Sequence, residues 1–487
     1  MHGDLTSEQL EVVRSIVEDQ EPGVFIVNSA PGSGKTTVAI AAIKAHMAAR
    51  PNDRILMLTF NKNTDESIRQ RFGSVPLLSR PTSGGHSRTC VCTVNAAGYS
   101  LLSMHNSRII QYDDAAWEAG LQCDDTGPVA TAVLETMGTG GGEPFKQEDD
   151  VGRIASETLR SIEHVFTAPR RSMLRPKQQP DEDDTALDDD SKTIVLPFAV
   201  QTYIPVRLGL RSPVAFDLVV VDEFQDLQPV DARLCLLFSP RRLVLVGDRY
   251  QSIYQWRGAR CDEVERLSCA AFRRRVDLHL TRSFRCPTVV ADVASRLVGN
   301  VVVGREDAAD SYVRRCSVKE WTQLASEVSE NACMMARTWS RLRAMTESLS
   351  AEGIPVILDG VKYFRGPQMM MVSGGSDMVS LLRCPRRVGH FKKRNTDDET
   401  TDFGRRAVWF ELLSVAARNY GRRIESIYAT NKKKTVSLTT VHQMKGREVD
   451  HAAFWYEDDK AGKNEDEEIN IMYTAITRAR IGFAFVG

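Results

Sequence analysis

The stretch NSAPGSGKTT at residues 28–37 constrains the fold more than any other part of the chain. It follows the apolar run at 24–27 and precedes a helix-like segment that reaches residue 44. The stretch nearly matches the phosphate-loop pattern G-x-x-x-x-G-K-[ST], except that Ser29 replaces the first glycine. A strand, a glycine-rich turn and a helix in this order direct backbone N–H groups and the positive helix end at a phosphate. The stretch therefore predicts a nucleotide site in an α/β domain.

The residue types inside this loop suit a nucleoside triphosphate and its metal. Gly32 and Gly34 can adopt the backbone angles that such a loop needs. Lys35 can reach the β and γ phosphates, and Thr36 can ligate Mg²⁺. Ser29 is tolerated provided that its position does not need a positive φ. The expected nucleotide ligands of the loop are Gly32, Ser33, Gly34, Lys35, Thr36 and Thr37.

A carboxylate pair supplies the other half of the expected site. Asp222 and Glu223 follow the apolar run at 216–221, in the sequence VVVDEFQD. At the end of a buried strand, Asp222 is expected to hold Mg²⁺, and Glu223 is placed to orient and deprotonate an attacking water. The chain therefore combines a phosphate loop with the acids that ATP hydrolysis needs.

Short apolar runs rich in β-branched residues recur along the chain, with helix-like segments between them. Fully apolar strands of this kind indicate parallel sheets that are covered by helices on both faces. The first set of runs is at 24–28, 55–59, 89–93, 216–221 and 243–246. The second set is at 332–338, 354–358, 435–440 and 481–486. The predicted fold class is therefore α/β, with two parallel-sheet domains.

Two stretches interrupt this pattern. Residues 103–213 are rich in Pro, Gly and acids, and we expect an inserted accessory subdomain of modest helices with an acidic loop at 181–190. Residues 365–434 are basic and polar, and we expect a short second insert with one helix near 403–420. The expected first and second domains are 1–102 with 214–290, and 291–364 with 435–487.

The balance of charged residues limits which kinds of nucleic-acid-binding protein the chain can be. The chain has 63 Lys and Arg against 64 Asp and Glu, which argues against a uniformly basic nucleic-acid binder. Seven acids gather at 181–190, and without them the rest of the chain carries a net charge of +6. Short basic clusters, such as that at 273–275, are expected to be solvated unless they meet phosphates.

Ten scattered cysteines, with Cys90 and Cys92 as the one close pair, predict reduced structural thiols. The sequence shows neither a signal peptide nor a run long enough for a membrane span. We therefore expect an intracellular protein, cytoplasmic or nuclear according to its host, that is not secreted and does not enter a membrane.

Eight short motifs follow one another along the chain. They are LTSEQ (5–9), SAPGSGKT (29–36), LTFNKNTDESI (58–68), DEFQD (222–226), VGDRYQSIYQWRGA (246–259), LTRSFR (280–285), TVHQMKGREVD (440–450) and NIMYTAITRAR (470–480). In this order they resemble superfamily 1 DNA helicases of the UvrD/Rep kind, and look closest to the F-box DNA helicase branch. The resemblance implies two RecA-like P-loop NTPase domains with inserted, mostly helical subdomains.

The resemblance also implies further contacts to ATP. Gln9 matches the residue that brackets the adenine edge, and Phe284 matches the aromatic residue that stacks on the base. Glu448 matches a ribose contact, and Gly446 lets the backbone pass close to the nucleotide.

Three more residues are implied beside the γ-phosphate. Gln251 matches the residue that couples the presence of this phosphate to DNA contact. Arg285 and Arg478 match two arginines that stabilise the charge developing in phosphoryl transfer, a task that suits a planar, always-charged group. Together with Lys35 and Glu223, they are the expected catalytic residues.

Aromatic residues beside a cation are expected to grip the nucleic acid. Tyr254, Trp256 and Arg257 lie within SIYQWRGA, and Phe60 lies within LTFNK. Stacking on such rings contributes roughly 1–3 kcal/mol per base and depends little on base sequence. The resemblance implies that these four residues form a platform for single-stranded DNA.

Three further positions are expected to contact the strand. The family usually has a histidine two residues after the threonine that Thr93 matches, whereas this chain has Asn95, which can donate to a phosphate but carries no charge. His442 in TVHQMKG does match the family pattern.

The implied activity is ATP-driven movement along single-stranded DNA, 3′ to 5′, with unwinding of tailed duplexes in DNA repair, recombination or replication. ATP and Mg²⁺ are the expected cofactors, the 103–213 insert is a possible contact for protein partners, and the expected state is a monomer. We expect neither a nuclease after residue 487 nor an F-box segment before Leu5. Two alternatives stay open: an RNA-directed helicase of the same superfamily, and a nucleotide-switched DNA clamp with little unwinding.

Overall fold

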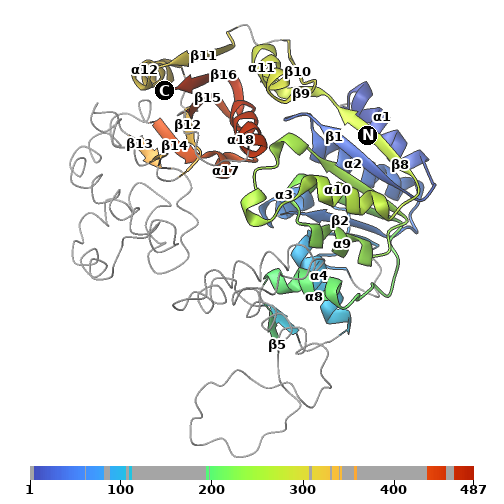
Figure 1. The fold of residues 1–487 in the computed structure, drawn as a ribbon. Helices are drawn as coiled ribbons and strands as arrows, with labels where there is room; N and C mark the ends of the chain where they lie inside the picture. The colour runs from blue at the N-terminus through green and yellow to red at the C-terminus, as the bar shows by residue number, and fades with distance from the viewer. Residues whose placement is uncertain are drawn as a thin grey trace, which may run out of the picture. The chain divides into compact units, whose positions relative to one another are not determined.

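The chain forms two compact units (Figure 1). One consists of Met1–Ser29 and Gly34–Leu280, and the other of Ala30–Ser33 and Thr281–Gly487. This computed structural model describes residues 5–60, 62–81, 88–105, 109–111, 194–196, 198–306, 310–328, 332–338, 341–342, 356–358, 436–456 and 465–487.

The first unit is built on a six-stranded sheet in the order β3-β2-β6-β7-β1-β8, in which every pair of neighbours is parallel. This arrangement confirms the α/β prediction. The strands are β1 (Gly23–Ser29), β2 (Ile55–Thr59), β3 (Thr89–Thr93), β6 (Leu218–Asp222), β7 (Arg242–Gly247) and β8 (Arg275–Leu280). A separate parallel pair consists of β4 (Ile109–Gln111) and β5 (Ile194–Leu196).

Helices cover both faces of this sheet, because successive strand residues point to opposite sides. In β1, Val24 and Ile26 join one core, whereas Phe25 and Val27 join the other. The α-helices are α1 (Ser7–Glu18), α2 (Lys35–Ala49), α3 (Lys62–Phe72), α4 (Val94–His105), α8 (Phe198–Arg207), α9 (Pro229–Leu237) and α10 (Cys261–Ala270). Three short 3₁₀ turns are η1 (Phe224–Asp226), η2 (Arg249–Gln251) and η3 (Gln255–Arg257). The hydrophobic core that contains Phe25 includes side chains of α1, α2 and α3. The core on the other face, which contains Val24, includes side chains of α4, α9 and α10.

The second unit has its own six-stranded parallel sheet, in the order β11-β16-β15-β12-β14-β13. Its core includes Trp321, Met334 and Leu438. The strands of the unit are β9 (Arg282–Pro287), β10 (Val303–Arg305), β11 (Tyr312–Cys316), β12 (Ala332–Ala336), β13 (Val356–Leu358), β14 (Val436–Thr440), β15 (Val449–Trp455) and β16 (Ala479–Val486). Its helices are α11 (Thr288–Val298), α12 (Val318–Val328), α17 (Val441–Met444) and α18 (Glu465–Ile476).

Each of the nine apolar runs that predicted a strand overlaps a strand of the structure. The structure also contains strands that no apolar run predicted. The edge strand β8 alternates exposed and half-buried residues up to the buried Leu280, and the edge strand β11 is half-buried or exposed throughout. Neither has the continuous apolar run that predicts a buried strand. The units divide between Leu280 and Thr281, whereas the sequence predicts a division after residue 290.

Several predictions concern residues outside the described ranges. They are the acidic tract at 181–190, the helix near 403–420, the whole 365–434 insert and most of the 103–213 insert. Among the described cysteines, none forms a disulfide. Within the same ranges, no helix has both the length and the apolar character that a bilayer crossing requires.

Candidate nucleotide site and nucleic-acid platform

The carboxyl ends of β6, β7 and β1 lie side by side in the first sheet, and the phosphate loop begins there. Ligands of open parallel sheets bind at this edge. The Ser29 hydroxyl donates a 2.6 Å hydrogen bond to the Gly247 carbonyl, so it joins the end of β1 to the end of β7. Ser29 is not among the residues with positive φ. The pattern therefore tolerates serine here, and the side chain has a structural partner.

Both glycines that the sequence singled out have left-handed backbone conformations. Gly32 has a φ of 71°, and Gly34, which precedes the first residue of α2, has a φ of 82°. A Cβ at Gly34 would come within 2.7 Å of the Gln9 amide nitrogen, and one at Gly32 would come within 2.6 Å of the Arg285 Cβ. Only glycine fits without strain at either position. The loop can therefore pass close to a phosphate at the start of α2.

Thr36 and Asp222 form the candidate Mg²⁺ pair. The Thr36 hydroxyl donates to an Asp222 carboxylate oxygen at 2.7 Å, and Asp222 is completely buried. Burial, and then the neighbouring charge of Glu223, raises the pKa of Asp222 to about 7. A buried carboxylate beside a hydroxyl suits Mg²⁺, which in nucleotide sites takes few protein ligands and completes its shell with phosphate oxygens and water. Within the described ranges, no group of three or more acidic, His or Cys side chains is arranged as a metal cluster.

Glu223 has an unusual backbone beside this pair. It adopts a left-handed conformation, with a φ of 57°, immediately after β6. Such conformations in residues other than glycine are costly and concentrate at functional sites. The Lys35 ammonium lies 3.9 Å from the Glu223 carboxylate. The structure thus gathers Lys35, Thr36, Asp222 and Glu223 at one edge of the sheet.

Gln251 lies in η2, directly after β7, and is buried. Its amide donates to the Asp248 carboxylate at 2.8 Å, and that carboxylate also accepts the Tyr250 backbone N–H at 3.1 Å. Burial raises the pKa of Asp248. Asp248 therefore fixes both Gln251 and the start of its turn, although it is not among the site residues predicted from the sequence. Its position in VGDRYQ, next to a strand end, is the signal that would have found it.

Gln225 is a second residue that the sequence analysis did not select. Its amide nitrogen donates to the Glu223 carboxylate at 2.6 Å, and its amide oxygen accepts the Asp248 N–H at 3.2 Å. The Ser252 hydroxyl donates to the Gln225 carbonyl at 3.0 Å. These bonds connect the turn after β6 with the turn after β7.

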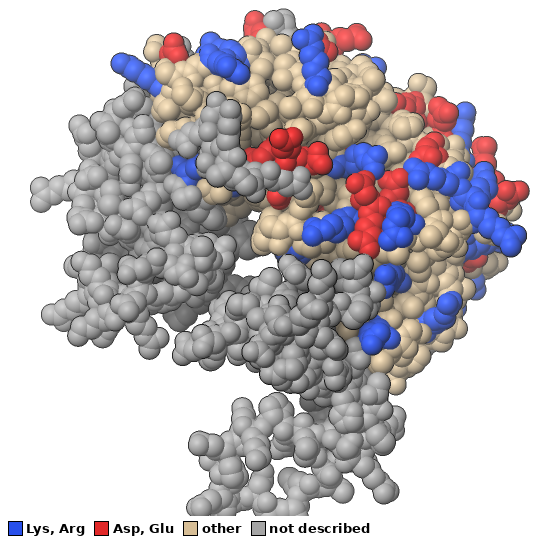
Figure 2. Space-filling model, in the orientation of Figure 1, with Lys and Arg blue, Asp and Glu red and all other residues tan. Residues whose placement is uncertain are grey.

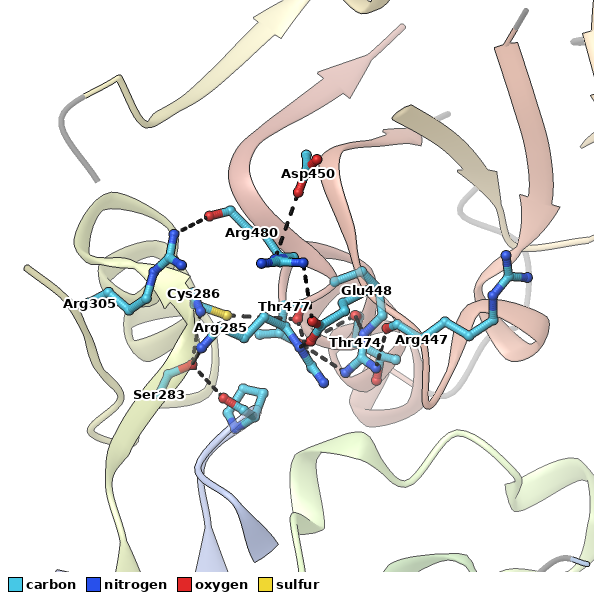
Figure 3. Close-up of polar contacts among 12 residues, drawn as sticks. Ser283, Arg285, Cys286, Arg305, Arg447, Glu448, Asp450, Thr474, Thr477 and Arg480 are labelled. Carbon is cyan, nitrogen blue, oxygen red and sulfur yellow. Dashed lines mark hydrogen bonds and ion pairs between the residues drawn. The ribbon is translucent and has the colours of Figure 1, made fainter. Parts of the chain in front are cut away.

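Arg285 and Glu448 lie together in the second unit (Figure 3). Arg478 is close enough to add to the charge around Glu448. Arg285 donates to the Glu448 carboxylate at 2.7 Å and to the Thr477 carbonyl at 3.2 Å. Burial raises the pKa of Glu448, but the bond from Arg285 and the surrounding guanidinium charges hold it below its usual value. Arg480, which lies 3.7 Å from Glu448, contributes to that field.

Arg478 is held by bonds to the chain around it. It is only 1% exposed, and it donates to the Thr474 carbonyl at 3.0 Å and to the Arg447 carbonyl at 3.2 Å. These carbonyl bonds fix the orientation of the buried, planar guanidinium. The arginine is thus preorganised to present positive charge.

The remaining predicted nucleotide contacts are spread over both units. The Gln9 side chain accepts the Thr6 N–H at 3.1 Å in a capping box at the start of α1. Phe284 follows the start of β9 and is 44% exposed, and its N–H donates to the Gly32 carbonyl at 2.9 Å. Gly446 has a φ of 81° between α17 and β15. The Thr37 hydroxyl accepts a bond from Arg71 at 2.6 Å.

The aromatic residues of the predicted platform form one cluster in the first unit. Phe60 and Tyr254 stack with ring centres 5.7 Å apart. The Arg257 guanidinium lies 5.8 to 6.0 Å from the ring centres of Phe60, Tyr254 and Trp256. Trp256 is 67% exposed. A large ring held in solvent beside a cation is suited to stacking on a base.

The other predicted strand contacts lie near helix starts. The Thr93 hydroxyl accepts the Ala96 N–H at 3.2 Å, at the start of α4. Asn95 is half-buried in the first turn of that helix. His442 is half-buried in α17, whose start is capped by Thr440. Their contact with a nucleic acid stays a prediction.

Charge on the displayed face is mixed rather than uniformly basic. Figure 2 shows Lys and Arg side chains interspersed with Asp and Glu. Within the basic cluster at 273–275, Arg274 pairs with Asp19, and Arg275 pairs with Asp277 and Glu265. These ion pairs support the solvated-surface interpretation of that cluster.

Two family descriptions match the sequence. The AAA domain matches residues 9–257, which is more than half of the chain. The UvrD-like helicase C-terminal domain matches residues 435–486. The first region contains the phosphate loop and the platform, and the second contains Glu448 and Arg478.

Curated relatives are similar over parts of the chain. A probable DNA helicase II homolog of Mycoplasma pneumoniae is 32% identical over 31% of this chain and 25% of its own length. DNA helicase II of Escherichia coli is 23% identical over 46% of this chain and 31% of its own length. The putative ATP-dependent DNA helicase YjcD of Bacillus subtilis is 25% identical over 74% of this chain and 49% of its own length. The chain thus spans less than half of the length of each of these relatives.

Proposed function

The chain belongs to the UvrD/Rep type of superfamily 1 helicases, and from this membership we propose that it is an ATP-dependent motor that moves on single-stranded DNA and opens duplex. One observation carries the proposal. The segment 248–257 holds Gln251 on the Asp248 carboxylate, whose backbone N–H is joined to Glu223 through Gln225. The same segment holds Tyr254, Trp256 and Arg257 in the aromatic cluster. A short, continuous segment therefore links the two sites on which such a motor depends.

In the proposed reaction, the loop holds the phosphates of ATP and Glu223 accepts a proton from the attacking water. Lys35 contacts the β and γ phosphates, and Thr36 and Asp222 hold Mg²⁺. When bound, Mg²⁺ supplies positive charge that neutralises the phosphate oxygens. Arg285 and Arg478 stabilise the charge that develops as the terminal phosphate leaves.

The nucleic acid is gripped by stacking in this proposal. Each base stacked on Phe60, Tyr254 or Trp256 gains roughly 1–3 kcal/mol, whereas opening one DNA base-pair step costs about 1.4 kcal/mol. One stacked base therefore offsets about one opened step. Release and rebinding, driven by ATP turnover, convert this grip into movement, and we propose that the direction is 3′ to 5′.

We also propose that residues 103–213 and 365–434 are accessory inserts in two RecA-like domains. Their separation from the motifs supports this division, since none of the eight motifs lies within either stretch. The inserts are the parts of the chain where DNA substrates and protein partners would be selected. The F-box branch stays a prediction.

The first test measures ATP hydrolysis by the purified chain with and without single-stranded DNA at low salt. We expect stimulation by about tenfold or more, and its loss in Lys35→Ala, because the ammonium no longer reaches the phosphates. Lys44→Ala in the same helix is the matched control and should keep the stimulation. A wild-type protein that DNA does not stimulate contradicts the motor proposal.

Tailed duplexes then separate the possible substrates and directions. We expect ATP-dependent strand separation with a 3′ tail and little with a 5′ tail. The RNA-directed alternative predicts stronger stimulation by single-stranded RNA than by DNA of the same sequence. The names of the relatives specify DNA, which favours the DNA substrate.

A further inference from the structure

Gln225 is completely buried between two parts of the candidate ATP site. Its amide has one orientation that satisfies both neighbours. The nitrogen donates to the Glu223 carboxylate at 2.6 Å, and the oxygen accepts the Asp248 N–H at 3.2 Å. The reverse orientation would direct an oxygen at a carboxylate and an N–H at an N–H. The contacts therefore define a directional bridge from Glu223 to Asp248.

The backbone around Gln225 is shaped to admit this bridge. A Cβ at Gly247 would lie 2.3 Å from the Gln225 amide oxygen and 2.7 Å from the Phe224 ring. Any larger residue at Gly247 would displace the amide. The Ser252 hydroxyl, which donates to the Gln225 carbonyl at 3.0 Å, holds the backbone from the other side. The side chain is thus fixed at both ends and along its backbone.

The bridge ends on a turn that is tied to the aromatic cluster. Asp248 accepts the Gln251 amide at 2.8 Å and caps η2, which leads through Ser252 to Tyr254 and Arg257. Arg249 in the same turn is anchored to Asp262 at 2.8 Å. A displacement of the turn therefore moves the Asp248 N–H, and with it the amide that holds Glu223.

We propose that Gln225 is a positioning residue that couples nucleic-acid binding at the 248–257 segment to the placement of the Glu223 carboxylate. The inference rests on the proposed function, because it assigns Glu223 the role of base. Gln225 itself touches neither ATP nor nucleic acid in this proposal. It fixes the position of the Glu223 carboxylate, the general base, when single-stranded DNA is bound.

The test compares hydrolysis rates of Gln225→Met and Gln225→Glu with those of the wild type, with and without single-stranded DNA. Methionine keeps the approximate volume and removes both bonds. Glutamate keeps the size and the acceptor for the Asp248 N–H but replaces the donor to Glu223 by an oxygen. It therefore breaks the bond and adds like-charge repulsion, whereas methionine breaks the bond without adding charge. We expect both variants to lose DNA stimulation by about tenfold, with KM for ATP and the Kd for DNA within about twofold of wild type.

Gln201→Met is the matched control. Gln201 is also completely buried in the first unit, but it lies on α8. We expect this control to keep the wild-type stimulation ratio. Thermal unfolding of all variants identifies any that fail to fold, and the isosteric glutamate variant carries the test if methionine does not fold.

Two results overturn the proposal. In one, the folded variants keep both the basal and the DNA-stimulated rate of the wild type. In the other, both rates fall in equal proportion, which makes Gln225 a support for the base without coupling. Failure of the proposed function is separate, because it appears as absent stimulation in the wild type.

Discussion

Ser29 shows how a single side chain can replace a glycine that a motif usually requires. Its hydroxyl bond to the Gly247 carbonyl is buried and joins two strand ends beside the phosphate loop. A buried neutral hydrogen bond contributes about 0.5–1.5 kcal/mol to stability. The same substitution also avoids the backbone entropy that glycine loses in a strand.

We therefore predict that Ser29→Ala lowers the free energy of unfolding by about 1 kcal/mol, because the bond is lost. Ser29→Gly, although it restores the usual pattern, should lower it by about 0.5–1 kcal/mol more. Urea unfolding at neutral pH measures both values. A glycine variant as stable as the wild type would contradict the role given to the hydroxyl.

A substitution at Glu223 can separate an effect on ATP hydrolysis from an effect on nucleotide binding. Glu223→Gln keeps the shape of the side chain but removes its capacity to accept a proton. We predict that kcat for ATP falls by about a hundredfold or more, with the Kd of a nonhydrolysable ATP analogue nearly unchanged. Steady-state ATPase kinetics measure kcat, and a binding titration measures the Kd of the analogue. Equal losses in both would show that the carboxylate acts in binding.

At the scale of elements, α1 and α2 are fastened to the sheet by a buried polar cluster. Arg242, at the start of β7, donates to the Ile16 carbonyl at 2.8 Å and contacts the His46 ring of α2. His46 is fully buried, and its ring nitrogen lies 2.8 Å from Asp53. The cluster fixes the end of α1, the helix whose first turn carries Gln9.

This cluster makes stability depend on pH. Burial lowers the pKa of His46 below its usual 6.5, with Arg242 adding to the decrease and Asp53 opposing it. The unfolded chain therefore binds the proton more readily than the folded chain. The stabilisation is complete above about pH 6.5 and is lost as the pH falls through that value towards the lower folded pKa.

We predict that the free energy of unfolding decreases between pH 8 and pH 5 by a larger amount in the wild type than in His46→Gln. Glutamine can still bond Asp53 but does not titrate. Urea unfolding of both proteins at the two pH values gives the difference. An equal pH dependence in the two proteins would exclude His46 as its source.

At the scale of the whole molecule, charge is distributed unevenly along the sequence. The seven acids at 181–190 turn a net +6 into −1. Association with a polyanion depends on this balance and is screened by salt. We therefore expect the tract to weaken attraction to nucleic acid at low ionic strength.

We predict that neutralising the seven acids with Asn and Gln tightens single-stranded DNA binding by about threefold to tenfold at low salt. The effect should fade as salt rises. Fluorescence anisotropy across a salt series measures it, and a variant with the same acids in scrambled order is the control. Unchanged affinity at low salt would show that the tract does not act through its charge.

The motifs could be predicted from the sequence because they combine local chemistry with local order. The phosphate loop lies between β1 and α2, and Asp222 ends β6, as their apolar flanks indicate. The edge strands β8 and β11 could not be found in this way, since partial burial leaves them without a continuous apolar run. Gln225 was missed because its significance depends on Asp248, which lies in another turn.

The sequence by itself determined the α/β class, the two sets of buried strands and the identity of the phosphate loop. These follow from hydrophobic periodicity and from residue types at fixed spacing, which are local properties. Only the tertiary structure decided that Ser29 bonds Gly247, that Arg285 pairs with Glu448 and that Gln225 joins Glu223 to Asp248. Parallel strands distant in the chain must first align before such bonds can form, so their partners are a property of the fold rather than of any one segment.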